Sequence, residues 1–146
     1  MSPRRCQLFL QQQRHLTRLL TTSSSKNHIK RMDPLNGLDI RVARILSADP
    51  FPEARKPAIK LRLDVGPEIG EKKSSAQIVA NHGSTDEQRA ELVGSLVLCV
   101  LGLPRRQIGK FMSEVLVLGV PDQDGNVVLI RPDPAKDGVV VGGRLY

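Results

Sequence analysis

The stretch that decides the fold is Ala58-Ile-Lys-Leu-Arg-Leu-Asp-Val65, in which apolar and polar residues alternate without interruption. The odd-numbered residues from Ile59 to Val65 are apolar, and Lys60, Arg62 and Asp64 stand between them. Strand side chains point alternately to the two faces of a sheet, so this period predicts a half-buried antiparallel strand. Lys60 and Arg62 would then lie on the exposed face, where solvated charges are a more common explanation than ligand binding.

Weaker patterns of the same kind surround this stretch. Ser84-Thr-Asp-Glu87 is typical of a capping box and predicts a short helix that runs through Leu92, and Asp122-Gln-Asp-Gly-Asn126 predicts a hairpin turn. Further strands are expected at 40–42 with a bulge at 43–46, and at 72–80, 95–101, 115–120, 127–131 and 139–141. The chain is therefore predicted to be an all-β small barrel with one short helix. The pattern alone leaves open an OB-fold, an SH3-like barrel and a sandwich.

The positive charge of the chain is confined to its first 31 residues. The 146 residues carry a formal net charge of +7, but residues 1–31 hold seven cations and no acid, and residues 32–146 hold 15 of each. The first segment has the composition of a mitochondrial transit peptide; the alternatives are a disordered basic tail or sequence upstream of a true start at Met32. We expect one folded domain, 32–146, in a protein that is mitochondrial if Met1 is the start and cytoplasmic if Met32 is.

Two clusters of cations and hydroxyls stand at or near strand starts. Lys72-Lys-Ser-Ser75 and Gln77 offer donors that suit phosphates or backbone carbonyls, although a solvated turn would need the same residues. In Arg105-Arg-Gln-Ile-Gly-Lys-Phe-Met-Ser113 the arginines suit bidentate phosphate contact and Phe111 could stack on a base. A charged hairpin tip with Phe111 in the core is equally supported. The candidate binding residues are Lys60, Arg62, Lys72, Lys73, Ser74, Ser75, Gln77, Arg105, Arg106, Lys110, Phe111 and Ser113.

These residues also carry a resemblance to a known family. The strings from Phe51 to Ile78 and from Leu103 to Gly119 resemble the tRNA-binding-domain group of OB-fold proteins, and within it the small dimeric chaperones of CsaA type. The resemblance spans Leu38–Gly142 and implies an OB-fold barrel with a five-stranded core, a homodimer, and tRNA as ligand. The family loop runs Asn-Leu-Lys-Pro and later Gly and Ser; here Gly102 replaces the Asn, and Lys110 stands where that Gly is expected.

Three functions are compatible with these patterns. The first is non-catalytic binding of tRNA or other structured RNA, the second is a chaperone that holds unfolded peptides, and the third is an accessory module of an aminoacyl-tRNA synthetase. An enzyme is not expected, because His82 is the one histidine after Arg31 and no serine or cysteine stands in a nucleophile motif. Neither a metal site nor a cofactor site is indicated. No run approaches the roughly 20 apolar residues of a membrane span.

Overall fold

The alternating stretch forms an interior strand of the main sheet. A computed structural model describes residues 35–146, so the expected targeting segment 1–31 lies outside the described residues. Strand β2 (Ile59–Asp64) pairs antiparallel with β1 (Asp39–Pro50) on one side and with β3 (Glu71–Ala76) on the other. Ile59, Leu61 and Leu63 are at most 1% exposed, as the alternation predicted. Burial of this apolar face is what stabilises the strand.

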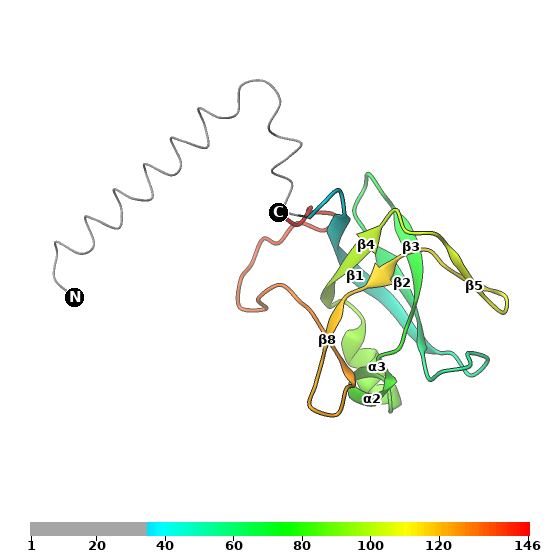
Figure 1. Ribbon diagram of the computed structural model, residues 1–146. Helices are drawn as coiled ribbons and strands as arrows, with labels where there is room; N and C mark the ends of the chain where they lie inside the picture. Colours follow the sequence, from blue (N-terminus) through cyan, green and yellow to red (C-terminus); the bar gives the residue numbers. More distant parts are fainter. Residues whose placement is uncertain (1–34) are drawn as a thin grey trace, which may run out of the picture. The chain divides into compact units, whose positions relative to one another are not determined.

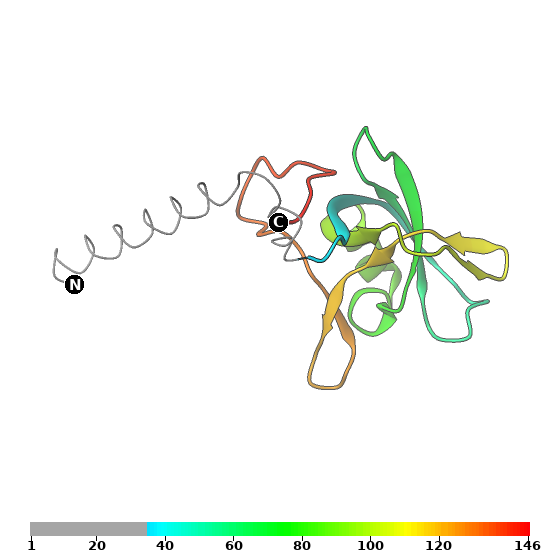
Figure 2. The same cartoon turned by 45° about the horizontal axis from the view of Figure 1, so that its top comes forward.

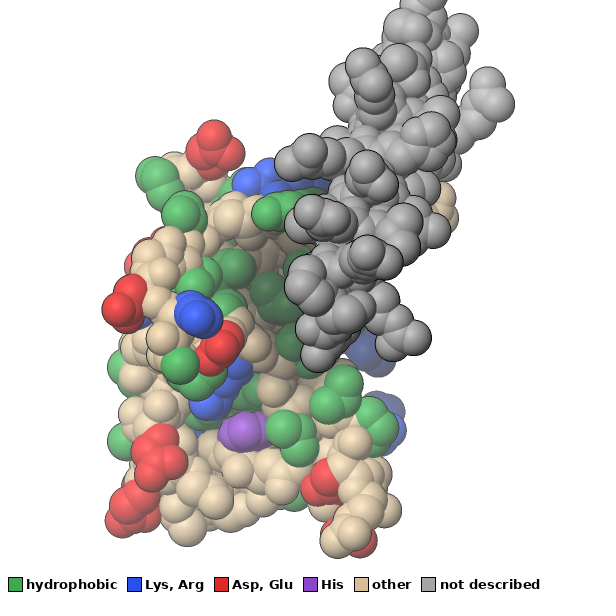
Figure 3. All heavy atoms as spheres, turned by 90° about the vertical axis from the view of Figure 1, so that its left-hand side faces the viewer, with side chains coloured by type: hydrophobic (Ala, Val, Ile, Leu, Met, Phe, Trp, Pro, Cys, Tyr) green, Lys and Arg blue, Asp and Glu red, His purple; other side chains and the backbone are tan. Residues whose placement is uncertain are grey.

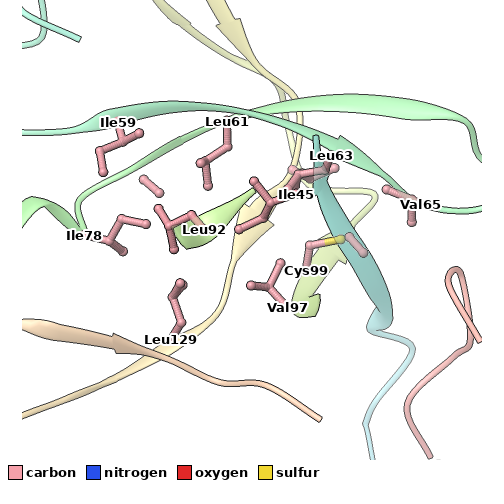
Figure 4. Close-up of a cluster of buried hydrophobic side chains, with 13 residues drawn as sticks. Ile45, Ile59, Leu61, Leu63, Val65, Ile78, Leu92, Val97, Cys99 and Leu129 are labelled. Atoms are coloured by element: carbon pink, nitrogen blue, oxygen red, sulfur yellow. The ribbon is translucent and has the colours of Figure 1, made fainter. Parts of the chain in front are cut away.

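The sheet is curled around a single core. Strands β4 (Leu96–Leu101) and β7 (Leu116–Val117) complete the order β3-β2-β1-β4-β7. The long β1 pairs with β4 through its first half and with β2 through its second half, and the pairing register shifts between Ile45 and Ser47. This irregularity confirms the bulge predicted at 43–46, and a bulge bends the strand so that one sheet can wrap around a core (Figure 4).

The two ends of the curled sheet meet at β3. The backbone N–H groups of Glu114 and Val115 donate to the carbonyl oxygen of Lys73 at 2.8 and 3.4 Å. The buried Ser74 hydroxyl donates to the carbonyl oxygen of Val115 at 2.9 Å. These bonds join the start of the sheet to the segment just before β7. The result is a small barrel, as the sequence predicted, and it is of the OB type that the resemblance implied.

Two short helices, α2 (Val79–His82) and α3 (Asp86–Leu92), lie together at one end of the barrel (Figure 1). The strand expected over 72–80 therefore ends early, because the chain turns into α2 after Ala76. The capping box is one residue later than predicted: Thr85 Oγ1 accepts from the Gln88 N–H at 3.2 Å, and Gln88 Oε1 accepts from the Ser84 N–H at 2.8 Å. Leu92, at 1% exposure, anchors α3 to the core.

Two hairpins project from the barrel. Strands β5 (Arg106–Ile108) and β6 (Phe111–Ser113) form one, and β8 (Gly119–Pro121) and β9 (Val127–Leu129) form the other around the predicted turn. Figures 1 and 2 show the β5–β6 hairpin on the same side of the barrel as the loop between β1 and β2. The sequence predicted the β8–β9 turn because its Asp-Gly-Asn signal is local. It predicted no strands at β5 and β6.

The expected last strand at 139–141 is absent from the described chain. The C-terminal segment instead follows the edge of β1: the N–H groups of Gly142 and Leu145 donate to the carbonyl oxygens of Val42 and Ile40, both at 2.8 Å. No helix within 35–146 is long and apolar enough to cross a membrane. Acidic and basic side chains are interspersed over the side of the molecule seen in Figure 3, in keeping with the neutral net charge of residues 32–146.

Candidate functional site

The outer face of β2 and β3 brings four predicted residues together. In the strand register Lys60 stands opposite Ser75, and Arg62 stands opposite Lys73. Directly opposed residues share a face, and this face is turned away from the buried Leu61 and Leu63. The side chains of Lys60, Arg62, Lys73 and Ser75 are therefore neighbours on one exposed surface, which we call the outer face.

Lys72 and Ser74 of the first cluster do not belong to the outer face. Ser74 is completely buried, and its hydroxyl is used to join the barrel ends. Lys72 stands opposite Leu63, on the face of β3 that Ser74 shares. The pleat of the strand thus divides the sequence cluster in two, which corrects the expectation that all four residues of 72–75 point at one ligand. Ser74 has a structural role.

The β5–β6 hairpin is joined directly to the outer face. Ser113 Oγ accepts a hydrogen bond from the Ser75 N–H at 3.0 Å, and Ser113 stands opposite Arg106 in the hairpin. A hydroxyl oxygen that accepts this bond still has its own proton to donate. The two predicted clusters, 38 residues apart at this bond, therefore meet in space.

A groove of about 230 Å³ lies between β3 and the base of this hairpin. Its polar wall includes Ser75 and Gln77, which share a side as the alternation predicted, together with Arg106, Ser113 and Glu114. The remaining wall is mostly apolar and comprises Leu103, Pro104, Ile108, Val115 and Leu116. A small concave site with an apolar wall and a few hydrogen-bonding groups is suited to orient one flat or extended ligand group.

Two phenylalanines link the hairpin to the loop between β1 and β2. The rings of Phe51 and Phe111 meet edge to face, with 5.4 Å between centroids. Lys60 Nζ lies 5.3 Å from the Phe51 centroid, and Lys73 Nζ lies 5.6 Å from the Phe111 centroid. The sequence left open whether Phe111 stacks on a ligand or packs in the core. The ring is partly exposed and lies under the Lys73 ammonium, so it is neither fully buried nor fully free. Cation–π contact also holds both lysines over the outer face.

Carboxylates neutralise part of this surface. Arg62 pairs with Glu71 at 2.8 Å, and the hydrogen bond to Glu71 raises the pKa of the Arg62 guanidinium. Arg105 lies 3.9 Å from Glu114, whose second carboxylate oxygen accepts from the Lys73 N–H at 3.0 Å. Within the described residues, five predicted cations have no carboxylate oxygen within 4.0 Å of their side-chain nitrogens: Lys60, Lys72, Lys73, Arg106 and Lys110.

Sequence reasoning missed Glu114 and Phe51 as parts of the site. Glu114 reaches it through a pairing between β3 and a segment 41 residues away, which no local pattern indicates. Phe51 belonged to a quoted string, but it enters the site only through its contact with Phe111. The one local signal for Glu114 would have been its place in the sequence: it is an acidic residue directly after Ser113, at the end of a cluster of candidate phosphate-binding residues.

A curled five-stranded barrel that presents cations and hydroxyls beside a narrow groove defines a small OB-fold binding module. Residues 40–139 match the model of the family described as "Putative tRNA binding domain". The chain belongs to this tRNA-binding domain family.

The chain is similar to solved structures and to curated protein sequences. The chain is 39% identical to the CsaA chaperone protein of Picrophilus torridus, covering 77% of this chain and 94% of that one, with a TM-score of 0.65. It is 35% identical to the chaperone CsaA of Bacillus anthracis, covering 84% and 100%, with a TM-score of 0.64. A methionine–tRNA ligase of Chlorobium chlorochromatii is 31% identical over 68% of this chain, and the matching part is 13% of that ligase.

Proposed function

We propose that this protein binds tRNA, or another structured RNA, without chemical conversion. The observation that carries the proposal is the meeting of the two basic clusters: the Ser75–Ser113 hydrogen bond sets the hairpin cations beside the cations of the outer face. Lys60, Lys73, Arg106 and Lys110 contact phosphates, because among the described residues no carboxylate forms an ion pair with their side chains within 4.0 Å; the cross-strand acid beside them is Asp49, opposite Lys60. Membership of the tRNA-binding domain family supports the same ligand.

Salt dependence tests this mechanism. Neutralising about four phosphates per site should give a slope of log affinity against log salt of roughly −3 to −4. The measurement is a titration of the full chain with bulk tRNA at several salt concentrations. Arg106→Glu should weaken binding and make the slope shallower by about 1, whereas the same reversal at Lys136, in the loop after β9, should not. Equal effects of the two reversals would contradict the placement of the site.

Three side chains that could act as nucleophile or base are engaged in structure. The buried Cys99 thiol has a pKa raised to about 11, chiefly by desolvation, so it is protonated at neutral pH. His82 Nε2 accepts a hydrogen bond from the Leu129 N–H at 3.2 Å. The Ser74 hydroxyl is buried and donates to Val115. These assignments support a binding protein rather than an enzyme.

A second candidate is a chaperone that holds extended peptides. It is favoured by the apolar wall of the groove and by 35–39% identity to proteins that are described as CsaA chaperones. Apolar peptide contacts change little with salt, whereas phosphate contacts weaken steeply. Charge reversal at Arg105 and Arg106 should therefore abolish RNA binding and leave apolar peptide binding largely intact. Loss of both would show that one shared surface carries both ligands.

We further propose a homodimer, as the resemblance to dimeric chaperones implies. Val120 and Val128 stand opposite each other on the β8–β9 hairpin and are 49% and 37% exposed. An exposed cross-strand apolar pair is suited to burial against a second copy. Sedimentation equilibrium should then give twice the chain mass of 16.1 kDa, and Val120→Asp should reduce it to one chain.

Two proposals concern the cell. The composition of residues 1–31 favours mitochondrial import, and an intact Met1 in protein recovered from cells would contradict cleavage of that segment. Similarity to part of a methionine–tRNA ligase supports docking on a synthetase as a weaker alternative, which co-purification from native extract would test.

A further inference from the structure

The groove beside β3 differs chemically from the outer face next to it. The outer face presents ammonium and guanidinium groups, whereas the groove adds the carboxylate of Glu114 to hydroxyl, amide and apolar side chains, with Arg106 as its one cation. A phosphate would be repelled by this carboxylate. The groove therefore suits a different part of an RNA from the part that the cations contact.

We propose that the groove holds one unpaired nucleobase that carries an exocyclic amine, a proposal that rests on RNA binding by the adjoining outer face. Its volume of about 230 Å³ is below the roughly 300–1,000 Å³ of pockets for drug-sized ligands, so it suits a single flat group. Bases within an RNA duplex are not accessible to such a groove, whereas unstacked bases of loops and ends are.

Glu114 gives the groove its selectivity. An ionised carboxylate is a pure acceptor with about four lone-pair sites. The structure uses one oxygen for the Lys73 N–H at 3.0 Å and sets the other 3.9 Å from Arg105, so acceptor capacity remains. A base amine can donate to it, as cytosine N4 does to Glu or Asp in nucleic-acid complexes. Uracil has a carbonyl oxygen at that position, which the carboxylate would repel.

The surroundings of the groove fit the rest of a nucleotide. Ile108 and Leu116 give apolar contact to the faces of the base, and Gln77 can donate and accept at its edge. Arg106 lines the groove, and Lys110 lies at the tip of the same hairpin, where both can contact the flanking phosphates. An extended peptide would use the apolar contacts but would leave these cations without partners.

The test compares two short RNAs that differ at one base. Heptauridine and the same RNA with cytidine at its centre are titrated against the full chain, so that the contribution of the basic segment 1–31 is the same for both. The cytidine RNA is expected to bind at least about fivefold more tightly. A fully paired duplex with the same number of phosphates should bind less tightly than the cytidine RNA.

A matched pair of variants assigns the preference to the groove. Glu114→Gln keeps an acceptor for the Lys73 N–H and adds a donor for uracil, so the ratio of the two affinities should fall toward one. Glu91→Gln, which removes the same charge at an exposed position of α3, should leave the ratio unchanged.

Three results would overturn the inference. If the two heptamers bind with equal affinity while tRNA binding stays salt-dependent, the proposed base-binding role of the groove is wrong and the proposed RNA-binding function is unaffected. If neither the heptamers nor tRNA bind, both the base-binding role of the groove and the proposed RNA-binding function are wrong. Displacement of the cytidine RNA by an apolar heptapeptide that binds more tightly would assign the groove to peptides.

Discussion

Ser74 and Ser75 are adjacent in β3, but their side chains lie on opposite faces of the sheet and have different roles. Ser74 is fully buried and donates to the Val115 carbonyl, whereas Ser75 lies opposite Lys60 on the outer face. Ser74→Ala should lower the free energy of unfolding by about 1–3 kcal/mol, because it leaves a buried carbonyl without its donor. Urea denaturation measures this. Ser75→Ala is the matched control and should change stability by less than about 0.5 kcal/mol.

His82 makes stability depend on pH. Partial burial is the larger cause that lowers its pKa, and the charge of Arg131 is the smaller one. The unfolded chain therefore binds the proton more readily than the folded one, so stability is complete above about pH 6.5 and falls as the pH falls through the folded pKa. Protonation also removes the acceptor that Leu129 uses.

Urea midpoints measured between pH 5 and pH 8 test this dependence. His82→Gln keeps a side-chain acceptor without a titrating group and should flatten the curve in that range. Asp122, whose pKa is lowered chiefly by the hydrogen bond from Asn81, affects stability only below its ordinary value of 3.8. A drop that persists in the His82→Gln variant between pH 5 and pH 7 would assign the effect to other groups.

At the scale of elements, the C-terminal segment depends on a close approach of two backbones. Gly142 has φ +87°, and a Cβ there would lie 2.7 Å from the Val65 carbonyl oxygen. Gly142→Ala should therefore destabilise the chain by about 1–3 kcal/mol more than Gly138→Ala, where φ is +79° but no atom lies within 4 Å. The difference in unfolding free energy measures the contact itself. Faster exchange of the Leu145 amide, which donates to Ile40, would place the effect in this segment.

The elements that the sequence predicted are those set by local patterns. Strand β2 follows from its alternation, α3 from its capping residues, and the β8–β9 turn from Asp-Gly-Asn. The joining of β3 to residues 113–115 was not predictable, because a hydrogen bond between Ser75 and Ser113 leaves no period in the chain. The same limit applied to the site. Alternation predicted that Ser75 and Gln77 share a side, but the role of Glu114 needed the three-dimensional pairing.

At the scale of the whole molecule, two separate parts of the chain contain cations that could contribute to the proposed RNA binding. Residues 1–31 hold seven cations without an acid, and residues 32–146 are neutral overall. Among the described residues, Lys60 and Lys73 of the outer face and Arg106 and Lys110 of the adjoining hairpin have no ion pair within 4.0 Å. A basic segment alone binds nucleic acid without selectivity, because its contacts are to phosphates. The folded part must therefore supply whatever preference the protein has for a folded RNA.

Removal of residues 1–31 separates the two contributions. Among the described residues 35–146, the buried apolar residues lie between Ile40 and Leu129, so the shortened chain 32–146 contains this core. This shortened chain should bind tRNA more weakly than the full chain and with a shallower salt slope, by up to about 0.9 per lost phosphate contact. Its preference for tRNA over a duplex of equal charge should be retained. If circular dichroism shows that the shortened chain is folded but it binds neither RNA, the basic segment accounts for all binding. The proposal that the outer face binds RNA would then be wrong.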